Sequence, residues 1–195
     1  NSNNDFVVHR AQIDPGGNWV VLDLEMHSMK VTLISLYGPN EDNPVFFENI
    51  GKLMTDFDNP HAIICGDWNL TQDQNIDNFN YFHVNNPRAK RVVEDLKNRF
   101  DLIDPWRQQN PTVKRFTWRR TSPLKQSRLD FFLCSKELFS LLKETDILPG
   151  YRTDHSIVTL VLNSVEGKRG RGYWKFNNSL LEDQNYKQLV IEKII

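Results

Sequence analysis

The chain has 195 residues, of which 39% are hydrophobic and 25% are charged, so it is long enough to bury one substantial core. Its formal net charge of -1 gives no general sign of an acidic partner. No stretch approaches the roughly 20 consecutive apolar residues that cross a bilayer, and the polar start is not typical of a signal peptide. We therefore expect a soluble, intracellular protein with one main domain and an appendage, and no membrane partner.

The first part of the sequence predicts an antiparallel group of strands. Three short segments are rich in Val, Ile, Leu and Thr, and two of them alternate in polarity. Turn-forming residues lie between the first and second segments, at Asp14–Asn18, and between the second and third, at His27–Met29. We therefore predict hairpins that connect strands at residues 6–9, 19–25 and 30–37.

Two helices and a central strand follow. Asn43 and Asn86 each precede a proline, and this pairing of an N-cap residue with a first helical residue predicts a helix start. Apolar residues then recur with helical spacing as far as Phe57 and Phe100, respectively. Between the helices, residues 61–65 form a short apolar run that ends at a glycine, as expected of a central strand that delivers a loop.

The second half of the sequence contains further strands and helices. A short helical turn is predicted at Asp104-Pro105, where the pairing of a cap residue with proline recurs. Because hairpins and helical crossovers both occur, the order of elements predicts an α/β or α+β fold with a mixed sheet. The remaining predicted elements are strands at 129–133, 145–148 and 156–162 and a helix at 136–142.

We divide the chain into three parts. Residues 1–164 contain all of the predicted strands and form the main domain. Residues 165–178 form a basic linker, and residues 179–195 begin a helix that opens with a capping box at Ser179. The chain has no initiator Met, and its last residues stop within an amphipathic helix that lacks a cap, so we expect a piece of a longer polypeptide.

Polar side chains follow the ends of several predicted strands, beginning with the central one. Asp67 and Asn69 come directly after that strand, and residues two apart in an extended segment face the same way. A carboxylate can bind a hard cation or take a proton from water, and an amide can hold the nucleophile or a phosphate oxygen. The alternative is an ordinary turn, because Asp and Asn favour turns.

A second pair and a histidine accompany two other strands. Asp130 is the candidate to orient His155, because the adjacent Asp154 side chain diverges from the histidine in an extended chain. Arg128 could pair with Asp130 or reach a phosphate, and a purely structural ion pair is the alternative. Three polar clusters at three strand ends together suit metal-assisted cleavage of a phosphodiester.

Two further segments are candidates to contact a substrate. Tyr37 and Asn40 follow another predicted strand, where a phenol and an amide could contact a phosphate or sugar, although turn formation explains them equally well. Residues 107–128 carry seven Lys and Arg and no Asp or Glu, and aromatic residues alternate with cations near Arg119 and Arg120. This pattern favours nucleic-acid contact over a solvated loop.

These motifs resemble the endonuclease/exonuclease/phosphatase superfamily and, within it, the apurinic-endonuclease-like domain of LINE-type non-LTR retrotransposons. The resemblance covers nearly the whole chain. The tail at residues 172–181 also resembles the segment that joins this endonuclease to a reverse transcriptase in such proteins. The matching motifs, in order, are Leu36–Asn40, Gly66–Asn69, Phe116–Trp118, Ser127–Asp130 and Thr153–His155.

The resemblance implies a DNase I-like fold, an α/β (α+β) sandwich of two packed mixed sheets flanked by helices. It implies nicking of one strand of double-stranded DNA with Mg2+ or Mn2+, in the nucleus. Asp67 would handle a proton and Asn69 would orient the nucleophile and phosphate. Asp130 would orient His155, which would stabilise the scissile phosphate. The implied metal ligands are Asp67, Asn69 and Asp154, and the implied substrate contacts are Tyr37, Asn40, Thr117, Arg119, Arg120 and Arg128.

The sequence also departs from the family pattern. The family begins with strands that carry an Asn and a metal-binding Glu, and nothing before Phe6 supplies them. We therefore expect a domain that lacks its N-terminal strands, roughly a third of a usual domain of ~200 to 250 residues, and that nicks poorly by itself. The alternatives are a catalytically inactive remnant that binds nucleic acid and a phosphatase of the same superfamily.

Overall fold

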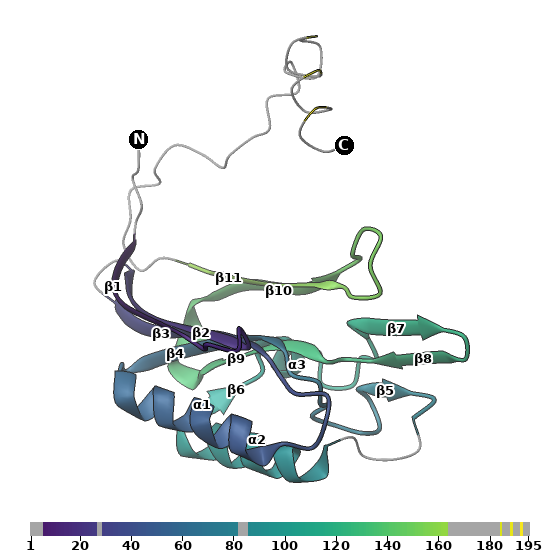
Figure 1. Ribbon diagram of the computed structural model, residues 1–195, viewed down its shortest axis with the longest axis horizontal. Helices are drawn as coiled ribbons and strands as arrows, with labels where there is room; N and C mark the ends of the chain where they lie inside the picture. Colours follow the sequence, from purple (N-terminus) through teal and green to yellow (C-terminus); the bar gives the residue numbers. More distant parts are fainter. Residues whose placement is uncertain are drawn as a thin grey trace. The chain divides into compact units, whose positions relative to one another are not determined.

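The structure is a computed structural model that describes residues 6–26, 29–81 and 86–163 and the single positions 184, 188 and 192. The chain divides into two compact units, one of residues 4–166 and one of residues 1–3 and 167–195. The predicted linker and the capping box at Ser179 lie outside the described residues. All of the strands that the structure describes belong to the larger unit (Figure 1).

A six-stranded mixed sheet forms the centre of the larger unit, in the order β1-β2-β3-β4-β9-β6. The first three strands are antiparallel, as predicted, and β4 runs parallel to β3 and antiparallel to β9. The apolar run predicted as a central strand is β4, which is flanked on both sides. The strands are β1 (Phe6–Ile13), β2 (Trp19–Met26), β3 (Met29–Tyr37), β4 (His61–Asp67), β9 (Asp130–Ser135) and β6 (Leu102–Ile103).

Helices α1 (Pro44–Phe57) and α2 (Pro87–Arg99) cover one face of this sheet (Figure 1). The predicted cap of α1 is confirmed, because the backbone N–H of Phe46 donates to Asn43 Oδ1 at 3.3 Å. The apolar stripes of both helices enter one continuous core with strands β2, β3, β4 and β9. Its fully buried members include Val21, Ile34, Phe47, Ile50, Ile64, Val93 and Leu133.

Helix α2 starts where the sequence predicts, but Asn86 does not cap it. Asn86 adopts a left-handed conformation with φ 50°, and its side chain makes no cap hydrogen bond. The backbone N–H groups of Arg88 and Ala89 instead donate to Asp42 Oδ1, at 3.1 and 2.8 Å. The Asp42 carboxylate therefore caps α2 from the loop before α1 and ties the two helix N-termini together.

The other face of the central sheet packs against a two-stranded antiparallel sheet of β10 (Leu142–Leu148) and β11 (Ile157–Leu162). The prediction of two packed sheets flanked by helices is thus confirmed. The predicted helix at 136–142 is instead a 3-10 helix, Lys136–Leu141. A second, smaller core joins the sheets and includes Val31, Ile63, Cys134, Leu138, Leu160 and Leu162.

A third sheet, which the sequence does not predict, carries the basic segment. Strands β7 (Trp118–Thr121) and β8 (Leu124–Ser127) form a hairpin, and β5 (Asn78–Phe79) pairs with β8. Lys, Arg, Ser and Pro dominate the hairpin and seldom favour strands, so its sequence alone predicts a loop. The short helix α3 (Pro105–Gln109) confirms the predicted helical turn. No helix in the described part of the chain is long and apolar enough to cross a membrane.

Candidate active site

Three neighbouring strands end with polar side chains in the same register. Strands β3 and β4 pair Tyr37 with Asp67, and strands β4 and β9 pair Asp67 with Asp130. Paired residues on adjacent strands project to the same face of a sheet, so these side chains form a row at one edge. The strand ends therefore meet as the sequence predicts, and they do so around Asp67.

The segment after β4 turns sharply instead of continuing as a strand. Asn69 is left-handed, with φ 49°, and its backbone N–H donates to Asp67 Oδ1 at 2.9 Å. The Asn69 side chain donates from Nδ2 to the carbonyl oxygen of Gly38 at 2.7 Å. The prediction of an extended Asp-x-Asn segment is therefore wrong, because the turn-forming preference of Asn prevails. Both side chains nevertheless border the same pocket.

Trp68 fixes this turn from below. Its ring is fully buried and is stacked between Phe47 and Phe131, with centroids 6.0 and 4.8 Å away. Its Nε1–H donates to the Phe131 carbonyl oxygen at 2.9 Å. Trp68 therefore packs into the core, and its burial holds the flanking Asp67 and Asn69 in place.

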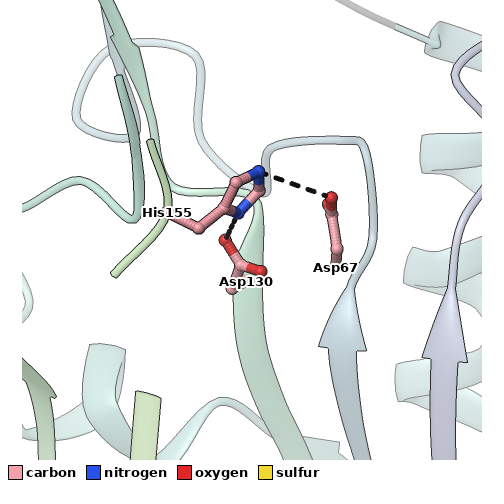
Figure 2. Close-up of side chains that lie close together, drawn as sticks. All are labelled: Asp67, Asp130 and His155. Atoms are coloured by element: carbon pink, nitrogen blue, oxygen red, sulfur yellow. Dashed lines mark hydrogen bonds and ion pairs between the residues drawn. The ribbon is translucent and has the colours of Figure 1, made fainter. Parts of the chain in front are cut away.

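His155 reaches the row from the loop that joins β10 and β11. Its Nδ1 lies 2.9 Å from Asp130 Oδ2, and its Nε2 lies 3.9 Å from Asp67 Oδ2 (Figure 2). Because a carboxylate only accepts hydrogen bonds, the Nδ1–H donates to Asp130 and Nε2 faces Asp67. The predicted pairing of His155 with Asp130, and not with the adjacent Asp154, is confirmed.

Thr117 is hydrogen-bonded both to the segment that carries Asp130 and to the segment that carries His155. Its hydroxyl accepts the backbone N–H groups of Leu129 and Asp130, each at 2.9 Å. Its carbonyl oxygen accepts the N–H of Ser156, next to His155, at 2.6 Å. Thr117 is fully buried, so it has no surface for the substrate contact that the family resemblance implies. We correct that expectation to a structural role.

Arg128 also lies in the interior, with 1% of its surface exposed. Its Nε donates to Asp77 Oδ1 at 2.7 Å and its Nη1 to Asp104 Oδ2 at 2.6 Å. Arg107 also donates to Asp77 Oδ1, at 2.5 Å. The predicted pairing with Asp130 is therefore wrong, and so is the implied contact of Arg128 with DNA. The structural ion pair, which was the alternative, is what the structure shows.

A polar pocket of about 330 Å3 opens beside the row. At its rim, the exposed Asp154 accepts a hydrogen bond from Trp118 Nε1 at 3.0 Å. The Trp118 ring lies 6.3 Å from that of Tyr81, centroid to centroid. Tyr81 follows a turn-rich stretch that contains no motif, so the sequence does not identify it as a residue of the site. The lining is Tyr37, Asn40, Asp67, Asn69, Tyr81, Trp118, Leu129, Asp154 and His155.

Comparison by sequence finds a relative in a transposon. The chain is 32% identical, over 163 residues, to the 149 kDa protein of transposon TX1 from Xenopus laevis. The match takes in 81% of this chain but only 12% of the length of that relative. No protein-family model matches the chain.

Solved structures with the same fold are nucleases and a DNA phosphatase. They include the 3′ phosphatase NExo of Neisseria, which was solved with a product DNA hairpin (TM-score 0.67, 18% identity, 81% of this chain and 72% of that one). The AP endonuclease LMAP of Leishmania major has a TM-score of 0.61 at 17% identity, over 76% of this chain and 55% of that one. The endonuclease domain of TRAS1, a telomere-specific non-LTR retrotransposon, has a TM-score of 0.60 at 18% identity, over 84% and 72%.

The chain has the DNase I-like fold that the family resemblance implies. The relative in a transposon supports the resemblance to a LINE-type domain, and the TRAS1 domain shares the fold. Structural likeness at 17 to 18% identity concerns the fold, so the chemistry rests on the residues of this chain.

Beside the pocket, three side chains form a group that could hold a metal ion. Ligand atoms of Asp67, Asp130 and His155 all lie within 4.8 Å of one another. Burial raises the pKa of Asp67, the N–H of Asn69 lowers it, and the charges of Asp130 and Asp154 raise it further. A cation near Asp67 would relieve that crowding of negative charge. The group shares only Asp67 with the set that the family resemblance implies, which also contained Asn69 and Asp154.

The two arginines predicted to contact DNA lie on β7, beside the pocket. Arg119 donates from Nη2 to Ser156 Oγ at 2.6 Å, and Arg120 donates from Nε to the carbonyl oxygen of Ser122 at 3.0 Å. Both border a second groove of about 810 Å3, which shares Trp118 and Asp154 with the pocket. The structure therefore puts these arginines within a short distance of the residues that surround His155.

Proposed function

We propose that this domain is a DNA endonuclease that nicks one strand of duplex DNA with the help of a divalent cation, Mg2+ or Mn2+. One observation carries the proposal. Asp130 holds His155 so that its Nε2 faces Asp67, at the mouth of an open polar pocket. The transposon relative, the AP endonucleases of the same fold and the TRAS1 endonuclease domain support it.

In the proposed reaction, Asp67 and His155 act on a phosphodiester in the pocket. Asp67 accepts a proton from the attacking water, whose oxygen forms a bond to phosphorus while the bond from phosphorus to a sugar oxygen breaks. His155, in its doubly protonated form and held by Asp130 through Nδ1–H, donates from Nε2 to a phosphate oxygen and stabilises the charge that develops there, while the departing sugar oxygen takes a proton from solvent. Tyr37 and Asn40 lie where they can contact the phosphate or its sugar.

The residues of the pocket fit a hard divalent cation. Mg2+ is usually held by one or two carboxylates together with waters and phosphate oxygens of the substrate. Because Asp130 and His155 already bond to each other, we propose that Asp67 is the main protein ligand, with Asn69 and Asp154 completing the set. When bound, the cation would neutralise charge on the phosphate.

We also propose the setting in which the domain acts. Duplex DNA as the substrate would place it in the nucleus, and the resemblance of residues 172–181 suggests a reverse transcriptase in the same polypeptide. The chain spans 12% of the TX1 relative, so a polypeptide of that length has ample room for a reverse transcriptase domain. Sequencing the full transcript tests this arrangement, and an open reading frame with no reverse transcriptase would contradict it.

Nicking of supercoiled plasmid by the complete natural polypeptide, in Mg2+ and in EDTA, tests the proposed activity. We expect conversion to the open-circular form in Mg2+ only. DNA binding without conversion would overturn the proposal in favour of an inactive binding remnant. Release of phosphate from DNA ends without nicking would overturn it in favour of a phosphatase.

A further inference from the structure

A second groove lies between the β7–β8 hairpin and the loop that joins β10 and β11, which run beside each other (Figure 1). Hydrogen bonds join these segments: Trp118 Nε1 donates to Asp154 Oδ2, the backbone N–H of Arg119 donates to the Asp154 carbonyl oxygen at 3.0 Å, and the Arg119 guanidinium donates to Ser156 Oγ. The groove measures about 810 Å3, and its lining is Trp118, Arg119, Arg120, Thr121, Arg152, Thr153 and Asp154.

The groove is positively charged. Its lining contains three arginines and one carboxylate, that of Asp154. This carboxylate already accepts a hydrogen bond from Trp118. Arg120 and Arg152 are exposed, so their guanidinium groups are open to solvent. Because the groove is continuous with the pocket at Trp118 and Asp154, a polyanion seated in the pocket would extend along these arginines.

An exposed aromatic ring stands next to this groove. Tyr151 is 82% exposed, the highest value among the large hydrophobic residues that the structure describes, and it belongs to neither core. It directly precedes the three consecutive groove residues Arg152 to Asp154. The guanidinium of Arg152 lies over the Tyr151 ring, 5.2 Å from its centre, so a positive charge stands beside the aromatic ring. Packing within the domain does not explain this ring.

We propose that Tyr151 and Arg152 form a DNA-contacting tip beside the cleavage site, in which Tyr151 stacks on an unpaired nucleobase. Arg152, with Arg119 and Arg120, binds the backbone phosphates of the same DNA segment. Any base offers a flat face to an aromatic ring, so the preferred ligand class is duplex DNA with an unstacked base, such as a bulge or mismatch. This inference rests on the proposed function, because it takes DNA to be the substrate of the adjacent pocket.

The test uses the complete polypeptide and a duplex with one bulged 2-aminopurine, in EDTA so that no strand is cut. Stacking on Tyr151 should quench the fluorescence of the base analogue. Tyr151→Ala should weaken binding of the bulged duplex roughly tenfold, the usual scale for one stacked base, and abolish the quenching. Tyr151→Phe, which keeps the ring, should preserve both.

Two controls accompany this test. Phe6→Ala removes another exposed aromatic ring, 47% exposed, from strand β1 and should leave binding unchanged. Arg152→Gln should weaken binding of bulged and fully paired duplexes alike and lower the slope of log affinity against log salt by about 1.

Equal affinity and equal quenching for the wild type and Tyr151→Ala would overturn the inference. That result, obtained together with Mg2+-dependent nicking, would reject the stacking tip and leave the proposed function intact. Quenching that depends on Tyr151 in a polypeptide that never nicks DNA would reject the proposed function and leave the tip intact.

Discussion

At the scale of the residue, Asp67 is held where its charge is disfavoured. Burial raises its pKa most strongly. The backbone N–H of Asn69 and the charge of His155 lower it, the charges of Asp130 and Asp154 raise it, and the net effect is a raised pKa. Above its ordinary pKa of 3.8, the fold therefore carries this carboxyl at a cost that the unfolded chain does not bear. Such a cost is expected at a site shaped for catalysis, where function and stability oppose each other.

Asp67→Asn should therefore stabilise the fold while it removes the group proposed to accept the proton. The amide oxygen can still accept the Asn69 N–H, so the turn is preserved. Thermal unfolding in EDTA at neutral pH should show a higher midpoint for the variant than for the wild type. A lower midpoint would mean that Asp67 is a structural residue and not a strained functional one.

Asp77 illustrates the opposite case. Burial raises its pKa, but Arg128, the backbone N–H of Asp73 and the charge of Arg107 together outweigh burial, so its pKa lies below the ordinary 3.8. A carboxyl with a lowered folded-state pKa stabilises the fold above the unfolded-state pKa, and this stabilisation is lost as the pH falls through the folded-state value. The ion pair with Arg128 should therefore weaken only at pH values below about 4.

Asp77→Asn should lower the free energy of unfolding by about 3 kcal/mol at neutral pH, because it leaves Arg128 buried with one carboxylate fewer. The difference from the wild type should shrink as the pH falls below about 4. Urea denaturation across pH checks both statements. The matched control is Asp146→Asn, which breaks the exposed pair with Arg115 and should cost at most about 1 kcal/mol. Equal losses in the two variants would contradict the account.

The partners of His155 and Arg128 show what local sequence can and cannot predict. The partner of His155 was predictable because adjacent side chains diverge in an extended chain, which leaves Asp130 as the candidate carboxylate. The partners of Arg128 were not, because Asp77 and Asp104 lie 51 and 24 residues away and belong to no motif. Local spacing predicts which face a side chain occupies, whereas the depth of burial depends on which distant segments pack above it.

At the scale of the element, the edge of the central sheet depends on one glycine. Gly66 has φ 140°, which L-residues rarely adopt, and a Cβ there would overlap the carbonyl oxygen of Leu36 on β3. Strands β3 and β4 can therefore stay paired up to Tyr37 and Asp67 only with glycine at this position. The geometry of the site depends on that last pair.

Gly66→Ala should destabilise the fold by about 3 kcal/mol or more, because backbone strain and steric overlap add together. Gly17 provides the comparison, since its φ is 77° but nothing lies near a Cβ placed there. Gly17→Ala should lower the free energy of unfolding by only about 1 kcal/mol, because backbone strain acts there without steric overlap. Denaturant unfolding of both variants measures the difference, and equal costs would show that β3 and β4 do not need this close approach.

The elements that the sequence predicts are those with a strong apolar period. Strands β2 to β4 and helices α1 and α2 match their predictions within a few residues, since their apolar faces alone determine them. Strand β1 is exposed along its whole length and extends four residues beyond the predicted 6–9. The β7–β8 hairpin escapes prediction because it is basic, and it is stabilised by pairing with β5 and with the loop around His155. Tertiary pairing of this kind overrides the weak intrinsic preference of the residues.

At the scale of the whole molecule, acidic and basic groups are segregated although the net charge is only -1. The pocket gathers Asp67 and Asp154, while the adjoining groove gathers Arg119, Arg120 and Arg152. The overall layered fold was predictable from the order of elements, but this segregation was not, because it depends on how the hairpin folds back on the central sheet.

Charge reversal of Arg119 and Arg120 to Glu should weaken DNA binding and reduce its dependence on salt, since fewer counterions are released. The double variant Lys52→Glu and Arg91→Glu changes net charge equally at exposed positions of α1 and α2 and should bind nearly as the wild type does. Titration at several salt concentrations measures both slopes. Identical slopes for the two variants would mean that the groove does not face DNA.

The central claim is that His155, oriented by Asp130, acts in cleavage, and a second histidine in the same chain allows the most direct test. His9 also pairs with a carboxylate, at 3.0 Å from Glu25, but this pair is exposed and joins strands β1 and β2. We would measure the Mg2+-dependent nicking rate of the complete polypeptide with His155→Ala and with His9→Ala. We predict a loss of at least about 100-fold for His155→Ala and an unchanged rate for His9→Ala. Equal rates in both variants would contradict the account.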